Sequence, residues 1–151
     1  MITLDALKDK LTDNARLIGI DLGAKRIGIA ISDDKRKIAT PYMTIEYKNM
    51  KHLILELTSI IEENRIFGIV IGLPINMDGS FGKSAQSIKD KAKIISDETN
   101  LHTCLWDERL STSGAFNISS NLDIKFKEKK KNIDEKAATF ILQGAIDYLS
   151  N

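Results

Sequence analysis

Apolar residues in the first third of the chain are spaced as they are in β-strands. Residues 17–22 are apolar except for Asp21 and predict a buried strand, and isoleucines occupy every second position from Ile27 to Ile31. Residues 23–25 are typical of a turn between two such strands. A third strand is expected at about 38–46, where Pro41 favours the edge of a sheet because proline cannot donate a backbone hydrogen bond. These segments predict an antiparallel meander.

Outside this region the apolar pattern changes between helical and strand spacing. The expected helices cover about 1–12, 51–64, 82–99, 111–120 and 133–149. Short apolar runs predict two further strands, at about 67–73 and 102–107. Strands that alternate with helices imply parallel crossovers. The expected fold class is therefore α/β, a mixed sheet with three antiparallel strands, then parallel strands, and helices on both faces.

Composition narrows the functions that such a fold can serve. The 151 residues are 42% hydrophobic and 28% charged, an ordinary globular balance. We expect a helical extension at residues 1–15 and a single domain at residues 16–151. The longest apolar stretch, residues 66–75, is far shorter than the roughly 20 residues of a membrane helix. One cysteine, Cys104, excludes an intramolecular disulfide, and with no export signal at the N-terminus the expected location is the cytoplasm.

The charge balance does not by itself attract a polyanion. Twenty-two basic and 21 acidic residues give a net charge of +1, so a nucleic acid would have to be held by local contacts. Two histidines leave little material for a zinc site or for histidine-based catalysis. Chemistry carried by carboxylates is what remains.

Acidic residues stand at the ends of three predicted elements. Asp21 ends a buried strand, where a carboxylate calls for a cation opposite it. Asp107 and Glu108 follow another strand on opposite faces, and Asp134 lies at the predicted start of the last helix, on its apolar stripe. Such an oxygen cluster suits Mg²⁺ or Mn²⁺, and two ions about 4 Å apart would support phosphodiester hydrolysis.

Each of these acids also has a purely structural interpretation. Asp21 is typical of a turn aspartate before Gly23, and Asp134 of a residue that caps a helix dipole. Arg109 offers a neutralising partner for Asp107 or Glu108. The pattern of residues leaves both interpretations open.

Four segments of the chain, in this order and spacing, resemble the YqgF family. They are residues 19–33 (GIDLGAKRIGIAISD), 72–80 (GLPINMDGS), 107–112 (DERLST), and 134–138 (DEKAA) with 141–143 (ILQ). The resemblance implies a ribonuclease H-like fold and a nuclease that matures the 5′ end of pre-16S ribosomal RNA. Members have also been called Holliday junction resolvases. Carried over by position, Asp21, Asp134 and one of Asp107 and Glu108 would be catalytic and bind metal, with Glu108 favoured by analogy.

Several basic or polar residues are candidates for phosphate contacts. Residues 72–84 lead from a strand into a helix, and free N–H groups at a helix start attract anions. Lysine clusters lie close in sequence to Asp21 and Asp134, although lysine runs are usually solvated surface and Ser80 is also a candidate helix cap. The residues expected to contact nucleic acid are Lys25, Arg26, Ser80, Lys83, Arg109, Lys129 and Lys130.

The leading hypothesis is a metal-dependent endonuclease that acts on pre-ribosomal RNA, with a ribosome or pre-ribosomal particle as partner and a monomeric or homodimeric state. One alternative is a resolvase of branched DNA with the same residues and metals. Another is a non-catalytic RNA-binding factor in ribosome assembly. A nucleotide-binding phosphotransferase is disfavoured, because such enzymes need two domains around the nucleotide.

Overall fold

The computed structural model describes residues 1–110 and 126–151, with side chains described for residues 1–110 and 133–151. Its strands are β1 (Arg16–Leu22), β2 (Arg26–Ser32), β3 (Ala39–Glu46), β4 (Ile66–Leu73) and β5 (His102–Asp107). Its helices are α1 (Leu4–Lys10), α2 (Met50–Asn64), α3 (Lys83–Thr99), the short 3-10 helix η1 (Glu108–Leu110) and α5 (Phe126–Ser150). The helix expected at 111–120 lies outside the described residues.

The strands form one mixed sheet in the order β3-β2-β1-β4-β5. β2 runs antiparallel to both β1 and β3, whereas β4 runs parallel to both β1 and β5. This arrangement confirms the predicted fold class. Pro41 lies in the edge strand β3, next to a shift of register between Ile29 and Ala30 of β2. An irregular edge is where a sheet tolerates proline.

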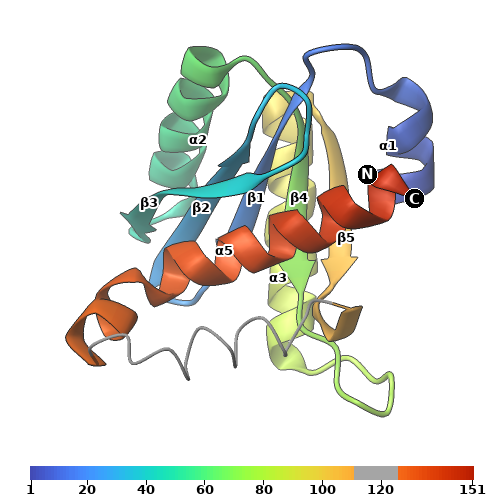
Figure 1. Ribbon diagram of the computed structural model, residues 1–151. Helices are drawn as coiled ribbons and strands as arrows, with labels where there is room; N and C mark the ends of the chain where they lie inside the picture. Colours follow the sequence, from blue (N-terminus) through green and yellow to red (C-terminus); the bar gives the residue numbers. More distant parts are fainter. Residues whose placement is uncertain (111–125) are drawn as a thin grey trace.

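Helices cover both faces of the sheet and bury two different cores. α5 crosses one face, and α2 and α3 lie on the other (Figure 1). The α2/α3 face is built from isoleucine and leucine side chains of the strands. On the α5 face the strands contribute mostly small residues, and the bulk comes from the helices and from Trp106. The end of α5 also meets α1, which brings the two chain termini close together (Figure 1).

The N-terminal residues dock against the far edge of the sheet. Thr3 caps α1 by accepting a hydrogen bond from the amide of Ala6 at 3.1 Å. The amide of Ile2 donates to the carbonyl of Thr103 in β5 at 3.0 Å, and Leu7 is completely buried in the α5-side core. The sequence predicts this helix but not its docking site, which is β5 together with α5.

The last helix begins earlier than its apolar pattern predicts. α5 starts at Phe126, so residues 126–131, expected as part of a connection, are helical. Lysine and glutamate are good helix formers, and no glycine or proline interrupts this run. Asp134 therefore lies in the interior of α5, beyond the first turn to which the helix dipole effect is confined. The interpretation of Asp134 as a cap is wrong. Across residues 1–110 and 126–151, no helix combines the length and apolar character needed to cross a membrane.

Polar residues of the segments that resemble the YqgF family form hydrogen bonds at the end of the sheet that carries the β2–β3 turn. The Ser32 hydroxyl accepts from the amide of Leu17 at 2.9 Å, and Asp33 accepts from the amides of Lys37 and Ile38. Gln143 of α5 accepts from the amide of Ala39 at 2.8 Å and also donates to a carbonyl of the β2–β3 turn. These contacts have a structural role.

Candidate active site

Asp21 faces α5 from the carboxyl end of β1. Ile18, Ile20 and Leu22 point into the α2/α3 core, so strand alternation turns Gly19 and Asp21 to the opposite face. Across the antiparallel pair, Asp21 lies opposite Gly28 of β2. The carboxylate is thus placed on the same face as the helix that carries Asp134.

Gly28 is the position at which α5 approaches the sheet most tightly. A Cβ atom on Gly28 would overlap the backbone carbonyl of Asp134. Only glycine leaves room for this contact, and because Gly28 is the cross-strand neighbour of Asp21, the contact sets Asp134 close to Asp21. The apolar pattern of β2 does not single out Gly28 for this role, although a glycine in a strand interior is a signal of close backbone approach.

Gly72 has the corresponding role on the other side of Asp21. It follows Ile71, the parallel partner of Ile20, near the end of β4. A Cβ atom on Gly72 would overlap Ile141 of α5 and would lie 3.2 Å from the carboxyl carbon of Glu108. The missing side chain therefore makes the space into which Glu108 turns.

Asp21 has a second carboxylate on each side, Asp134 of α5 and Glu108 of η1, and these three residues are called the acidic cluster below. Burial, and then the charge of Asp134, raise the pKa of Asp21 from 3.8 to about 6. Burial, and then the charges of Asp21 and Asp107, raise the pKa of Glu108 from 4.5 to about 7. Raised pKa values on neighbouring carboxylates are common at catalytic sites and at sites that bind cations.

Asp134 differs from its neighbours because it has a cationic partner. Its Oδ2 lies 2.9 Å from Nε of Arg26. Arg26 and Gly28 share one face of β2, so the same approach of α5 that places Asp134 over Gly28 also sets it beside Arg26. The cation expected opposite Asp21 thus pairs with Asp134. Among the described residues, no ion pair to Asp21 is found.

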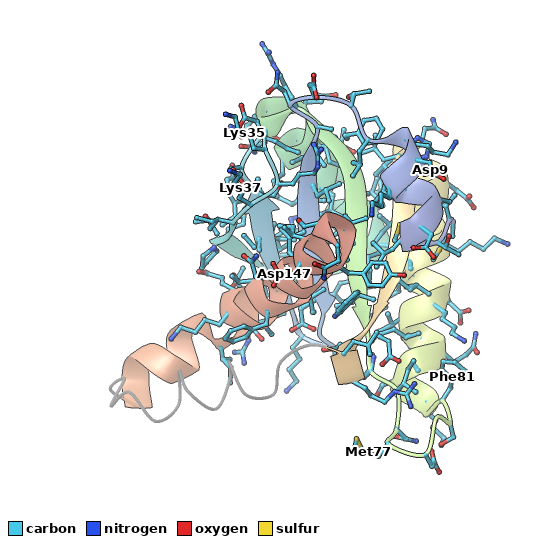
Figure 2. All side chains as sticks on the ribbon, turned by 45° about the vertical axis from the view of Figure 1, so that its right-hand side comes forward. Asp9, Lys35, Lys37, Met77, Phe81 and Asp147 are labelled. Carbon is cyan, nitrogen blue, oxygen red and sulfur yellow. The ribbon has the colours of Figure 1, made fainter. Side chains whose placement is uncertain are left out.

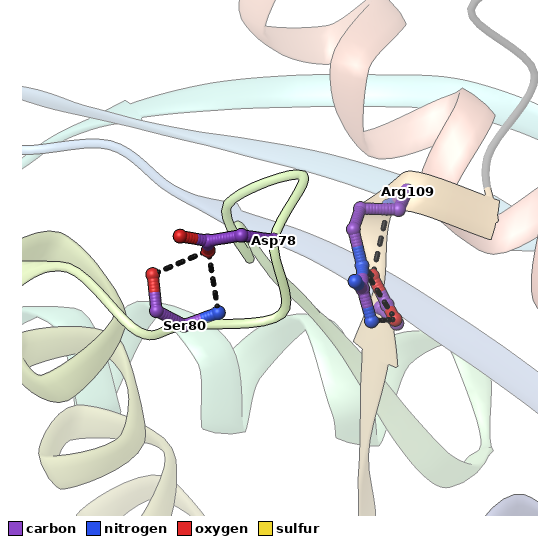
Figure 3. A network of polar contacts seen from close by, with 4 residues as sticks. Asp78, Ser80 and Arg109 are labelled. Carbon is purple, nitrogen blue, oxygen red and sulfur yellow. Dashed lines mark hydrogen bonds and ion pairs between the residues drawn. The ribbon is translucent and has the colours of Figure 1, made fainter.

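Asp107, next to Glu108 in the chain, is paired with Arg109. The Arg109 guanidinium donates from Nε to both carboxylate oxygens at 3.1 Å and from Nη2 to Oδ2 at 2.8 Å (Figure 3). These hydrogen bonds keep the pKa of Asp107 below its usual value. Of the two adjacent acids, Glu108 is therefore the one that faces Asp21. Arg109 is both a partner of Asp107 and a partly exposed cation.

The loop between β4 and α3 is closed by its own hydrogen bonds. Asp78 accepts from the hydroxyl of Ser80 at 2.6 Å and from its amide at 2.9 Å (Figure 3). The interpretation of Ser80 as a helix cap is wrong, because α3 begins after Gly82, which offers no side-chain cap. Figure 2 shows Met77 at the tip of this loop and Phe81 beside the start of α3, where Nζ of Lys89 lies 3.5 Å from the centre of its ring. Lys83 is exposed in the first turn of α3.

The basic residues do not all gather at the acidic cluster. Lys25 is exposed in the β1–β2 turn, next to Arg26. Lys35 and Lys37 lie at the other end of β2, at the opposite end of the molecule from Met77 and Phe81 (Figure 2). The side chains of Lys129 and Lys130 lie outside the described residues. Two of the described basic residues form ion pairs at this end of the sheet, Arg26 with Asp134 and Arg109 with Asp107.

The donor chemistry of the acidic cluster fits a divalent cation, but its geometry leaves Asp134 engaged elsewhere. Carboxylate oxygens are the ligands that Mg²⁺ and Mn²⁺ prefer, and burial together with the neighbouring carboxylates disfavours the ionised forms of Asp21 and Glu108, which a bound cation would favour. Within residues 1–110 and 133–151, no three acidic, histidine or cysteine side chains stand together so as to hold one ion. Asp134 points its Oδ2 at Arg26.

Comparison with protein families and with named relatives gives consistent results. The model of the RuvX family, described as Holliday junction resolvase, matches residues 15–148. A protein of Pelagibacter ubique named "Putative pre-16S rRNA nuclease" is 55% identical over 151 residues, which is the full length of both chains. A protein of Bradyrhizobium diazoefficiens with the same name is 45% identical over 135 residues, 89% of this chain and 84% of the relative.

Comparison with solved structures supports the fold. The RuvC protein of Thermus thermophilus, solved in complex with a Holliday junction substrate, superimposes with a TM-score of 0.59 at 9% sequence identity. The match covers 91% of this chain and 96% of that one. At this identity the match shows a common fold.

Proposed function

Because the chain belongs to the RuvX family, we propose that it is a nuclease that hydrolyses phosphodiester bonds. The observation that carries this proposal is the convergence of Asp21, Glu108 and Asp134 at the carboxyl ends of β1 and β5 and on the facing helix. Asp21 and Glu108 have raised pKa values, and among the described residues neither of them forms an ion pair that would account for its burial.

The proposed substrate is the precursor of 16S ribosomal RNA, cleaved in the course of its 5′ maturation, with the pre-ribosomal particle as partner. The name of the 55% identical relative from Pelagibacter ubique supports this choice, because the two chains match over their whole lengths. The reaction would take place in the cytoplasm, where ribosomes are assembled.

We propose that Asp21, Glu108 and Asp134 are the residues that hold one or two Mg²⁺ or Mn²⁺ ions. Bound there, such ions would lower the pKa of an attacking water and stabilise charge on the phosphate. The residues themselves concentrate negative charge in a half-buried site, so that cation binding relieves their mutual repulsion. Lys25, Arg26, Ser80, Lys83 and Arg109, together with Lys129 and Lys130, are proposed to contact the nucleic acid backbone.

A cleavage assay tests this assignment. The purified full-length chain is incubated with an RNA that spans the 5′ junction of a 16S precursor, in Mg²⁺ and in Mn²⁺. Asp21→Asn should lower the rate by at least about 10²-fold, as expected when a group that stabilises the transition state is lost. Asp9→Asn, an identical change at an exposed position on α1, is the matched control and should keep the full rate. Full activity in Asp21→Asn would show that the acidic cluster is not the active site.

A second candidate function is resolution of branched DNA, which the description of the family model favours. A four-way DNA junction in the same assay separates the two. Paired symmetric cuts that disappear in Asp21→Asn would identify a resolvase. Tight binding of the RNA without cleavage in either metal would instead support a non-catalytic assembly factor.

A further inference from the structure

The ion pair between Arg26 and Asp134 links an exposed, movable cation to a fixed acid of the acidic cluster. Its side chain is 59% exposed, whereas that of Asp134 is 19% exposed. The backbone of Asp134 is pressed against Gly28, so α5 cannot withdraw without opening the core. Arg26 is the first residue of β2, directly after the β1–β2 turn, and its long side chain reaches Asp134 from the rim of the site. Of the two partners, Arg26 is the one that is free to leave.

The pairing conflicts with the role expected of each partner. Asp134 is proposed to hold a divalent cation, yet its Oδ2 is occupied by a guanidinium 2.9 Å away. Arg26 is expected to contact a phosphate, yet it binds a carboxylate. A guanidinium binds carboxylates and phosphates with the same planar set of donors, so it can exchange one for the other without a change of chemistry.

We infer that Arg26 is the resident counter-ion of Asp134, that a divalent cation displaces it, and that the released guanidinium then binds a phosphate of the substrate. This inference rests on the proposed function and deepens it, because it makes cation binding and substrate binding successive uses of one residue. It explains why no three donors stand together in the described residues, since Arg26 holds Asp134 turned toward the rim.

If Arg26 competes with the cation for Asp134, loss of Arg26 should change the metal affinity in a defined direction. Removal of the guanidinium frees Asp134 and also removes a nearby positive charge, so metal binding should become tighter. Exposed ion pairs are weak, which limits the expected gain in affinity to about two- to fivefold. A residue that merely orients Asp134 for its metal would show the opposite sign, because its loss would weaken binding.

Calorimetric titration of the full-length protein with Mn²⁺, without nucleic acid, tests the first step. The variants are Arg26→Gln, Lys25→Gln as a control for loss of one neighbouring charge, and Asp21→Asn as a control for the site. We expect the dissociation constant to fall about two- to fivefold in Arg26→Gln, to change less in Lys25→Gln, and binding to be largely lost in Asp21→Asn.

The outcomes separate this inference from the proposed function. Equal or weaker Mn²⁺ binding in Arg26→Gln, with binding still lost in Asp21→Asn, overturns the inference and leaves the proposed function standing. The same tightening in Lys25→Gln also overturns it, because a general charge effect would then suffice. Absence of any Mn²⁺ binding that depends on Asp21 overturns both.

Steady-state cleavage of the RNA tests the second step. At saturating Mn²⁺, Arg26→Gln should raise KM for the RNA by about three- to tenfold, because one charged phosphate contact is lost, with a smaller effect on kcat. Tighter metal binding together with weaker substrate binding is a combination that a purely structural ion pair would not produce. An unchanged KM would overturn the proposed exchange.

Discussion

The two faces of the sheet are built on opposite principles. On the α2/α3 face, isoleucines of β1, β2 and β4 are buried against Leu53 and Leu57 of α2 and the apolar residues of α3. On the α5 face, the same strands carry Gly19, Gly28, Gly72 and Ala30, and the backbone of α5 lies against Gly19 and Gly28. Bulky side chains keep a helix away from a sheet, whereas glycines let it approach closely.

One face of the sheet therefore mainly stabilises the fold, and the other carries the candidate catalytic residues. The α2/α3 face removes a large apolar area from water and carries none of the candidate catalytic residues. The α5 face gives up side-chain volume at Gly28 and Gly72, and the space so made holds Asp134 and Glu108 beside Asp21. A site that crowds half-buried carboxylates costs stability, and the other face offsets that cost.

The largest effect on stability is expected from the α2/α3 face. Leu57 of α2 is completely buried, so Leu57→Ala should lower the free energy of unfolding by about 2–5 kcal/mol through lost burial and a residual cavity. The rate of cleavage per folded molecule should stay the same, because Leu57 faces away from the acidic cluster. Leu55→Ala, at a 64% exposed position of the same helix, is the matched control for urea unfolding. A large loss of kcat in Leu57→Ala would show that the two faces are not separable.

Gly28→Ala should disturb the packing of α5 on the sheet. Compared with Leu57→Ala, it should cost less stability and more activity. The new methyl group would overlap the carbonyl of Asp134, and overpacking of this kind costs about 1–3 kcal/mol. The displacement of α5 would move Asp134 away from Asp21, so cleavage should fall at least about tenfold, since small misplacements of a catalytic group are costly. Gly82→Ala, where an added Cβ meets no atom within 4 Å, is the control: it should cost at most about 1 kcal/mol, because alanine is a poorer residue than glycine before a helix, and should leave the cleavage rate unchanged.

The raised pKa of Asp21 on the α5 face predicts that the free energy of unfolding depends on pH. The size of this effect should be similar to or smaller than that of Gly28→Ala. The pKa of Asp21 is raised to about 6, so the folded protein binds this proton more tightly than the unfolded chain does. In metal-free buffer the contribution of Asp21 should therefore favour folding increasingly as pH falls from about 7 to about 4. Asp21→Asn removes the penalty and should raise the free energy of unfolding at pH 7 by about 1–3 kcal/mol.

Asp33 provides a control of opposite sign for that measurement. The amides of Ile38 and Lys37 donate to its carboxylate and hold its pKa below the usual value, so the ionised form stabilises the fold. Asp33→Asn should therefore not stabilise the protein at pH 7. Urea unfolding with a chelator at pH 7, for the wild type and both variants, gives the comparison. An Asp21→Asn variant that is less stable than the wild type would contradict the account of Asp21.

The smallest effect on the free energy of unfolding is expected from Asp107, the acid at the end of β5 that pairs with Arg109. Asp107→Asn weakens a partly exposed pair with Arg109 and should change the free energy of unfolding by less than about 1 kcal/mol. Glu108→Gln removes the acid that faces Asp21 and should reduce cleavage much more than Asp107→Asn does. Comparison of kcat for the two variants under one set of conditions decides between them. A greater loss in Asp107→Asn would reverse the assignment.

Much of the fold follows from local pattern. The apolar pattern predicts every described strand to within about two residues, because strands buried on both faces are short continuous apolar runs bounded by turn residues. The start of α5 is the main error, because a charged run such as residues 126–131 has helical propensity without an apolar stripe to mark it. The edge position of Pro41 follows from its missing donor.

The candidate site was predictable only in part. Asp21, Asp107, Glu108 and Asp134 stand out as acids at the ends of elements, and the resemblance favours Glu108. That Ser80 donates to Asp78, and that Arg26 binds Asp134, depends on side chains whose partners no local pattern specifies. The importance of Gly28 and Gly72 lies in what they leave empty, which becomes visible only when α5 is in place.

By itself the sequence determined the elements, their order, the mixed sheet and the set of candidate acids, because periodicity and turn residues are local properties of the chain. Only the tertiary structure decided which acids meet. The cross-strand pairing of Asp21 with Gly28 and the descent of α5 onto that glycine bring Asp134 to Asp21. Register and the distance between helix and sheet depend on packing between residues far apart in the chain, and no local pattern encodes them.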